Sequence, residues 1–201
     1  MPLWTNRYNG PGQRSDRANA VAVDGNNDVI VAGFTGWSTG TGGFYDYATI
    51  KYSGAGLPLW TNSYSGPVNK DDFGNALAVD GGNNVIVTGN SLGPGGSDDY
   101  ATIKYSSAGL PLWERRYSGP GASIDVAWAV AVDRSGNVIV TGIGGHDDFT
   151  TIKYICVPEP VLTGLQLTNG AFQIRVDEVL QPGTLVVEAS TDLPDWLPVF
   201  T

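Results

Sequence analysis

The chain has 201 residues with a formal net charge of −9, and 41% of its residues are hydrophobic while 15% are charged. This balance is typical of a folded protein, and the negative charge argues against binding to nucleic-acid phosphates or to anionic membrane surfaces. The 28 glycines and 12 prolines lie between apolar runs without a short period, as the tight turns of an all-β protein require.

The chain begins inside a repeated unit. Residues 2–8 read Pro-Leu-Trp-Thr-Asn-Arg-Tyr, residues 58–64 are a near copy, and residues 111–117 are a more divergent third one. No basic segment with an apolar stretch behind it precedes the first copy, so no signal peptide is visible, and a start inside a repeat indicates a piece of a longer protein. No apolar run reaches the length of a membrane span, so we expect no membrane insertion.

Each repeat continues with two apolar runs joined by a Gly/Asn turn, which predicts a β-hairpin. A third segment ends in tyrosine and, in the first two repeats, leads into the next Leu-Pro-Leu-Trp copy. The first runs end at Asp24, Asp80 and Asp133, the second at Gly33, Gly89 and Gly142, and the third segments at Tyr52, Tyr105 and Tyr154. The predicted fold is therefore all-β. It has three four-stranded β-propeller blades in residues 1–155, which form an incomplete propeller, and a linker with a small C-terminal β module in residues 156–201.

The pattern at residues 129–142, an Ala-Val-Ala-Val-Asp run, a Gly-Asn turn and a Val-Ile-Val-Thr-Gly run, occurs in all three repeats with small changes. It resembles the bacterial SBBP-type β-propeller repeats. This resemblance implies a propeller in a secreted or cell-surface bacterial protein, and it carries over no catalytic residues. Residues 185–199 resemble a small β-module at the C-terminus of exported bacterial proteins.

Length varies between repeats in one connection only. The distance from Trp4, Trp60 and Trp113 to the aspartate that ends the first run is 20 positions each time. The segments 34–45, 90–98 and 143–147, which join the second and third strands, all differ in length. Length variation confined to one loop indicates a surface, and in repeat folds such loops often line the binding face. We therefore expect ligands at the rim that these variable loops share with the Gly-Pro loops after Tyr8, Tyr64 and Tyr117.

Two sets of acids recur at this rim. Asp16, Asp72 and Asp125 each follow the repeat tryptophan by 12 positions, and Asp46, Asp99 and Asp148 stand where the variable loop enters the third strand. Carboxylates that converge near one point would attract a cationic ligand or bind Ca²⁺. In the second case, Asp46, Asp99 and Asp148 would be the ligands of the metal. The alternative is that these aspartates cap turns or pair with Lys51, Lys104 and Lys153. Repetition in every blade favours this structural role.

Aromatic residues give a second kind of ligand contact. Trp37 and Tyr45, with Phe44 between them in sequence, lie in the longest variable loop, where exposed rings would stack on sugars; simple loop packing explains them equally well. The repeated Trp4, Trp60 and Trp113 are expected to pack between blades.

A weak catalytic motif lies in the second repeat. Residues 89–93 match G-x-S-x-G, and Ser91, His146 and Asp148 together would make a triad for a hydrolase or lyase acting on a polysaccharide or an ester. Pro94-Gly95-Gly96 cannot begin the helix that such a motif needs. The first expectation is therefore a non-catalytic scaffold that binds protein or glycan, without a cofactor except Ca²⁺ if the acids hold one.

Three blades do not close a ring, since propellers have four to eight. The last repeat has no Leu-Pro-Leu-Trp strand after Tyr154, whereas the first has a spare one at residues 2–8. Two copies of the chain can exchange this strand and form a homodimer. In the alternative, residues 161–167 fill the outer position.

Overall fold

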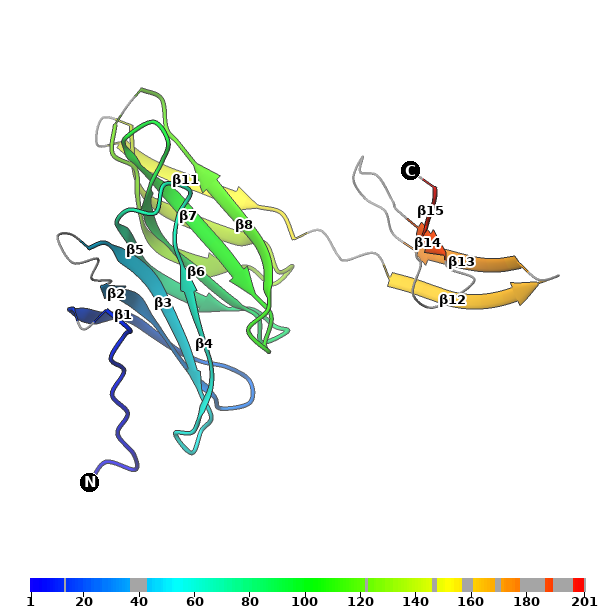
Figure 1. Ribbon diagram of the computed structural model, residues 1–201, viewed down its shortest axis with the longest axis horizontal. Helices are drawn as coiled ribbons and strands as arrows, with labels where there is room; N and C mark the ends of the chain where they lie inside the picture. Colours follow the sequence, from blue (N-terminus) through cyan, green and yellow to red (C-terminus); the bar gives the residue numbers. More distant parts are fainter. Residues whose placement is uncertain are drawn as a thin grey trace. The chain divides into compact units, whose positions relative to one another are not determined.

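The computed structural model describes residues 1–12, 14–36, 43–121, 123–145 and 148–156, and the backbone of four strands between residues 161 and 200. The chain divides into two units, Met1–Cys156 and Val157–Thr201, and each is described by itself. All the regular elements in these residues are strands, in agreement with the predicted all-β class (Figure 1).

The first unit contains three antiparallel sheets whose strands follow in chain order (Figure 1). Sheet 1 holds β1 (Asp16–Val23), β2 (Val29–Gly36), β3 (Tyr45–Tyr52) and β4 (Pro58–Tyr64). Sheet 2 holds β5 (Asp72–Val79), β6 (Val85–Leu92), β7 (Asp98–Tyr105) and β8 (Pro111–Tyr117). Sheet 3 holds β9 (Val126–Val132), β10 (Val138–Gly144) and β11 (Asp148–Tyr154).

The turn between the first two strands of each sheet is built by one aspartate. In sheet 2 the Asp80 carboxylate accepts hydrogen bonds from the backbone N–H groups of Gly82 (2.8 Å) and Asn84 (2.9 Å). Asp24 and Asp133 do the same in the other sheets. The third turn residue takes positive φ, at 63° in Asn27, 62° in Asn83 and 80° in Gly136. Asparagine and glycine tolerate this conformation, which explains why they recur there.

The second strands run past the glycine at which the sequence pattern ends. Residues 19, 75 and 128 are skipped in the pairing of the first two strands, so each sheet carries a β-bulge at the same place. Opposite the bulge, a side chain at Gly33 would collide with the Arg17 carbonyl, and one at Gly89 with the Phe73 carbonyl. The repeated glycine therefore allows the bulge and does not end the strand.

The core lies between the sheets. Ile30, Ala32 and Tyr47 of sheet 1 pack against Val85 and Val87 of sheet 2, together with other apolar side chains of that sheet. Sheets 2 and 3 meet in the same manner, through Ile86 and Tyr100 on one side and Ala127, Val138 and Val140 on the other. Because the middle sheet is covered on both faces, β6 and β7 are almost wholly buried, which accounts for the continuous apolar run at the start of β6.

The repeated tryptophan links neighbouring sheets, as predicted. Trp60 of β4 lies against Tyr105 of sheet 2, with 6.2 Å between ring centroids, and its indole N–H donates to the Ser107 carbonyl at 3.1 Å. Trp113 of β8 lies against Tyr154 of sheet 3 at 6.0 Å. The outer strand of one sheet therefore packs on the third strand of the next.

Sheet 3 has three strands, so the prediction of a third four-stranded blade is wrong. The reason is that no described segment supplies a strand beside β11. In the C-terminal unit, β12 (Val161–Thr168) pairs with β13 (Ala171–Asp177); that residues 161–167 fill the outer position of sheet 3 stays a prediction. The C-terminal unit also contains β14 (Val187–Ala189) paired with β15 (Leu197–Phe200).

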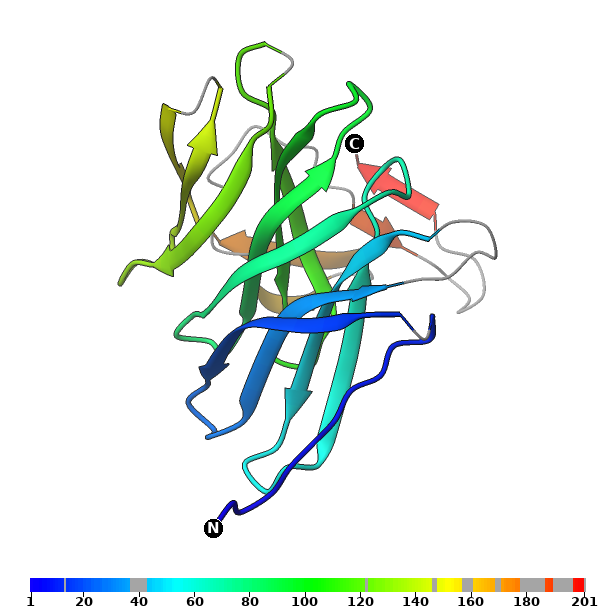
Figure 2. The same cartoon turned by 90° about the vertical axis from the view of Figure 1, so that its left-hand side faces the viewer.

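The N-terminal segment, residues 1–8, runs beside sheet 1 without pairing as a strand (Figure 2). It nevertheless contacts sheet 1 as β4 contacts sheet 2. Trp4 lies 6.0 Å from Tyr52 between ring centroids and donates to the Gly54 carbonyl at 3.1 Å. The segment thus contacts sheet 1 as an outer strand of a neighbouring sheet would.

Candidate functional site

A groove of about 550 Å³ opens along the first strands of the three sheets. Its lining combines aromatic rings and amides with one guanidinium: Arg17, Asn19, Phe34, Phe73, Asn75, Asn90 and Trp128. Three of these, Asn19, Asn75 and Trp128, are the bulged residues, so the same irregularity in each sheet brings one side chain to the groove. β-Bulges often re-aim side chains in this way next to functional sites.

The polar residues of the groove also connect the sheets. Asn19 donates to the Gly74 carbonyl at 2.9 Å and Asn75 to the Ala127 carbonyl at 3.1 Å, in each case from one sheet to the next. Asn75 donates as well to the side chain of Asn90 at 3.2 Å. For Trp128 the described residues show no such hydrogen bond to a further sheet, and its side chain is 56% exposed. Hydrogen bonds to the next sheet therefore hold the amides of Asn19 and Asn75 in place, while the indole of Trp128 is open to solvent.

An aromatic cluster borders the groove at the variable-loop end. Phe34 lies 5.1 Å from Tyr45 and 5.0 Å from Phe73 between ring centroids, both in edge-to-face geometry. Tyr45 and Phe73 are 5.5 Å apart. Of the two aromatic residues predicted to bind a ligand, Tyr45 therefore packs in this cluster, which includes two of the groove residues. Trp37 lies outside the described residues.

Asp16, Asp72 and Asp125 close the loops that precede the first strands. Each accepts a hydrogen bond from the backbone N–H of the glycine six positions earlier: Gly10 at 3.0 Å, Gly66 at 2.7 Å and Gly119 at 2.6 Å. Asp125 also accepts from the Gly145 N–H at 2.8 Å. Asp72 and Asp125 are fully buried. This geometry is the turn-capping alternative, and it leaves these carboxylates poorly placed to meet a ligand.

Ser91 lies in the middle of this loop-closing network in sheet 2. Its side chain is fully buried and accepts a hydrogen bond from the Arg116 guanidinium at 2.7 Å. The same guanidinium pairs with Asp99 at 3.2 Å and donates to the Ser91 carbonyl at 2.9 Å. Burial raises the pKa of the nearby Asp72 carboxyl to about 6, although hydrogen bonds from Gly66 and Ser91 oppose the shift.

The predicted triad of Ser91, His146 and Asp148 stays a prediction, since one of its members is not described. Ser91 continues strand β6, Asp148 begins β11 in another sheet, and His146 lies outside the described residues. The G-x-S-x-G segment runs from a strand into a turn, with Gly96 at a φ of 83°. The elbow between strand and helix that would expose the serine is therefore absent at residues 89–96.

Asp46, Asp99 and Asp148 occupy equivalent places in three separate sheets. Asp99 is buried and paired with Arg116, whereas Asp148 is exposed. Burial raises the pKa of Asp46, opposed by a hydrogen bond from Ser65. In the part of the chain that the structure describes, no three His, Cys, Asp or Glu side chains gather as metal ligands would.

The three repeated lysines do pair with aspartates, but with a set that the sequence analysis did not select. Lys51 lies 2.7 Å from Asp24, Lys104 lies 2.8 Å from Asp80, and Lys153 lies 2.7 Å from Asp133. Each pair ties the third strand to the turn between the first two. The signal was present in the sequence, since both residues recur once in every repeat.

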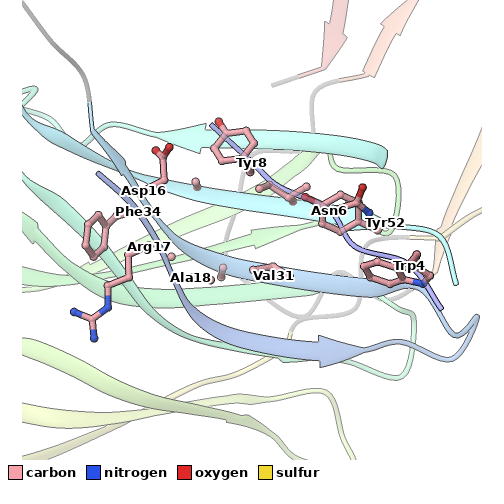
Figure 3. A pocket seen from close by; sticks show the side chains of 13 residues that line it. Trp4, Asn6, Tyr8, Asp16, Arg17, Ala18, Val31, Phe34 and Tyr52 are labelled. Atoms are coloured by element: carbon pink, nitrogen blue, oxygen red, sulfur yellow. The ribbon is translucent and has the colours of Figure 1, made fainter. Parts of the chain in front are cut away.

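A second hollow of about 310 Å³ lies between the N-terminal segment and sheet 1 (Figure 3). Trp4, Asn6 and Tyr8 of the segment face it, with β1, β2 and β3 contributing Ala18, Val31 and Tyr52. This hollow could not be predicted from the sequence, because its residues come from the N-terminal segment and from three strands of sheet 1.

The fold and its groove define the molecule as an all-β repeat protein built of stacked antiparallel sheets. No model of a known protein family matches the chain, and no curated protein sequence matches it at a significant level. Within the described residues, no helix is long and apolar enough to cross a membrane.

Proposed function

We propose that this chain is a non-catalytic binding scaffold, that its stacked sheets are blades of an SBBP-type β-propeller, and that it binds neutral glycans in the groove along the first strands. The observation that carries the proposal is the lining of the groove, in which Phe34, Phe73 and Trp128 surround the amides of Asn75 and Asn90. Aromatic rings with a few fixed polar groups are the common composition of ligand sites.

The chemistry of the groove favours an uncharged, hydroxyl-rich ligand. Amide side chains both donate and accept hydrogen bonds, as sugar hydroxyl groups require. Rings such as Trp128 offer flat apolar faces with little conformational entropy to lose. The net charge of −9 disfavours anionic ligands. The binding needs no cofactor, so a Ca²⁺ chelator is expected to leave it unchanged.

The binding role agrees with export from a bacterial cell, which the resemblance of the repeats supports. No observation favours the hydrolase or lyase, because the Ser91 hydroxyl is enclosed and already bonded to Arg116. A protein ligand in the same groove is the alternative that the experiment separates from a glycan.

A glycan array, followed by titration calorimetry of the hits with and without chelator, tests the proposal. The change Trp128→Ala should weaken binding at least roughly tenfold, because a half-exposed indole supplies much of the apolar contact area. Ile124→Ala is the matched control, since Ile124 is 62% exposed and lies outside the groove. A blank array, or equal affinity of the wild type and Trp128→Ala, would count against a glycan site here.

A further inference from the structure

Sheet 3 presents an uncovered face with the composition of a sheet interface. Tyr47 and Tyr100, which contact the next sheet, are 1% and 0% exposed, whereas Phe149 at the same position of β11 is 99% exposed. Ile139 likewise corresponds to Ile30 and Ile86, which are fully buried, but is only half-buried itself. The face that covers a following sheet in sheets 1 and 2 therefore covers no other sheet of the first unit in sheet 3.

The edge of sheet 3 is uncovered as well. β3 pairs with β4 and β7 pairs with β8, but β11 pairs only with β10 in the described residues. A free edge leaves a row of backbone N–H and C=O groups without strand partners. The strand that belongs there by the repeat pattern is another Leu-Pro-Leu-Trp copy.

The N-terminal segment is such a copy, and its side chains already make the contacts of an outer strand. Asn6 donates to the Gly56 carbonyl at 2.7 Å, as Asn62 of β4 donates to the Gly109 carbonyl at 2.7 Å. The segment lacks only the neighbouring strand to which β4 and β8 are hydrogen-bonded. The N-terminal segment therefore has no strand to pair with in the described residues, and sheet 3 has no outer strand beside β11 there.

The hollow in Figure 3 lies where the face of another sheet would pack against sheet 1. Between sheets 1 and 2 the equivalent space is filled by Ile30, Ala32 and Tyr47. Their counterparts on sheet 3 are Ile139, Thr141 and Phe149. The face of sheet 3 therefore carries two large apolar side chains, Ile139 and Phe149, at the positions that fill the equivalent space between sheets 1 and 2.

We propose that two copies of this chain join head to tail: residues 2–8 of each copy pair with β11 of the other, whose Ile139 and Phe149 fill the hollow beside sheet 1. Unlike surfaces meet in each contact, so two contacts close a ring of six sheets with two-fold symmetry. Six lies within the four to eight blades of known propellers, whereas three copies would make nine. This interface does not depend on what the groove binds.

The existing pairs fix the register of the exchanged strand. In sheet 2, Thr102 lies opposite Arg115 and Lys104 opposite Trp113. By the same register, Asn6 lies opposite Thr151, and Trp4 lies opposite Lys153. Arg7 then takes the place of Arg116, whose partner is Asp99, and so comes next to the exposed Asp148.

The first test is the mass of the full chain in solution, by light scattering after gel filtration. We expect twice the chain mass of 21.2 kDa. A strict monomer at high micromolar concentration, or a trimer, would overturn the proposal.

The second test is disulfide trapping in a Cys156→Ser background, which removes the only native cysteine. Chains with Asn6→Cys are mixed with chains with Thr151→Cys and oxidised. Residues directly opposite each other on neighbouring strands approach closely enough for a disulfide, so a covalent dimer should form in the mixture and not in either sample alone. The mixture of Asn6→Cys with Ile152→Cys is the control for register, because a slip of one residue points the two side chains to opposite faces.

The third test exchanges charges across the interface. Arg7→Glu or Asp148→Arg alone should weaken the dimer by roughly ten- to a hundredfold, and the two together should restore it. Lys70→Glu makes the same charge change on an exposed side chain of the loop between sheets 1 and 2 and should leave the dimer unchanged. Absence of both the Asn6–Thr151 crosslink and the charge rescue, in a protein that still dimerises, would place the interface elsewhere.

Discussion

Single aspartates carry much of the structure at the residue scale. In sheet 2, the aspartate that closes the loop and the one that builds the turn are chemically identical, yet their surroundings shift their pKa values in opposite directions. Burial raises the pKa of Asp72 to about 6. For Asp80, burial also opposes ionisation, but the hydrogen bonds from Lys104 and Asn84 outweigh it and lower the pKa. Sheet 2 therefore contains one carboxyl that stabilises the fold more at acidic pH, Asp72, and one that stabilises it more at neutral pH, Asp80.

The raised pKa of Asp72 makes a prediction about stability. The carboxyl has a pKa of 3.8 when unperturbed and about 6 in the fold, so between these values the folded state binds more protons than the unfolded chain. The contribution of Asp72 to the free energy of unfolding therefore falls as the pH rises through this window. The change Asp72→Asn keeps an acceptor for the Gly66 N–H and removes the charge. It should raise the free energy of unfolding at pH 7, by roughly 3 kcal/mol.

Urea unfolding of the wild type and Asp72→Asn at pH 5, 6 and 7 measures this effect. Asp71→Asn is a suitable control because the neighbouring Asp71 is exposed. If the two proteins respond alike to pH in this range, Asp72 is ionised in the fold like an ordinary carboxyl group.

At the scale of elements, the lysine of each third strand forms an ion pair with the turn aspartate of its sheet. The three pairs differ in how deeply they are buried. The lysine side chain is 3% exposed in sheet 1, 8% in sheet 2 and 54% in sheet 3. Hydrogen bonding from Lys153 lowers the pKa of Asp133 in the most exposed pair. The exposure differs because a following sheet covers the pairs of sheets 1 and 2, whereas no sheet of the first unit follows sheet 3.

The more deeply a lysine–aspartate pair is buried, the more its loss should lower the free energy of unfolding. Lys104→Met should lower the free energy of unfolding by about 3–5 kcal/mol, because it leaves a buried carboxylate unpaired. Lys153→Met should have a much smaller effect in an Arg7→Glu background, where the proposed exchange is suppressed and the pair stays exposed. Denaturant unfolding of both variants in that background checks the order. Equal costs would mean that burial does not decide the strength of the pairs.

The sequence was enough to predict the strands of sheets 1 and 2, because their apolar runs, turn residues and spacing repeat. It was not enough for the bulges. Asn19 and Asn75 look like ordinary strand residues, since a bulge is a property of two paired strands and not of one run. The groove was missed for the same reason. Its residues come from different sheets, and the pattern of each strand says nothing of what it shares with the next.

At the scale of the whole molecule, the proposed exchange predicts a melting temperature that depends on concentration. Two copies stabilise each other by mass action, so the melting temperature should rise as the protein concentration rises. A variant that lacks residues 1–8 should melt lower and at a temperature independent of concentration. Calorimetry over a hundredfold range of concentration distinguishes the two. A constant melting temperature for the full chain, with an unchanged value after the deletion, would contradict the exchange.

The free edge of β11 has a further consequence for handling and for evolution. An uncapped strand with an exposed phenylalanine is a template for other chains, and a contact between unlike surfaces closes only if the angle between sheets is right. A substitution that altered this angle, for example at the glycines opposite the bulges, would turn closure into open-ended growth. The same edge that completes a ring in one sequence would then nucleate filaments in another.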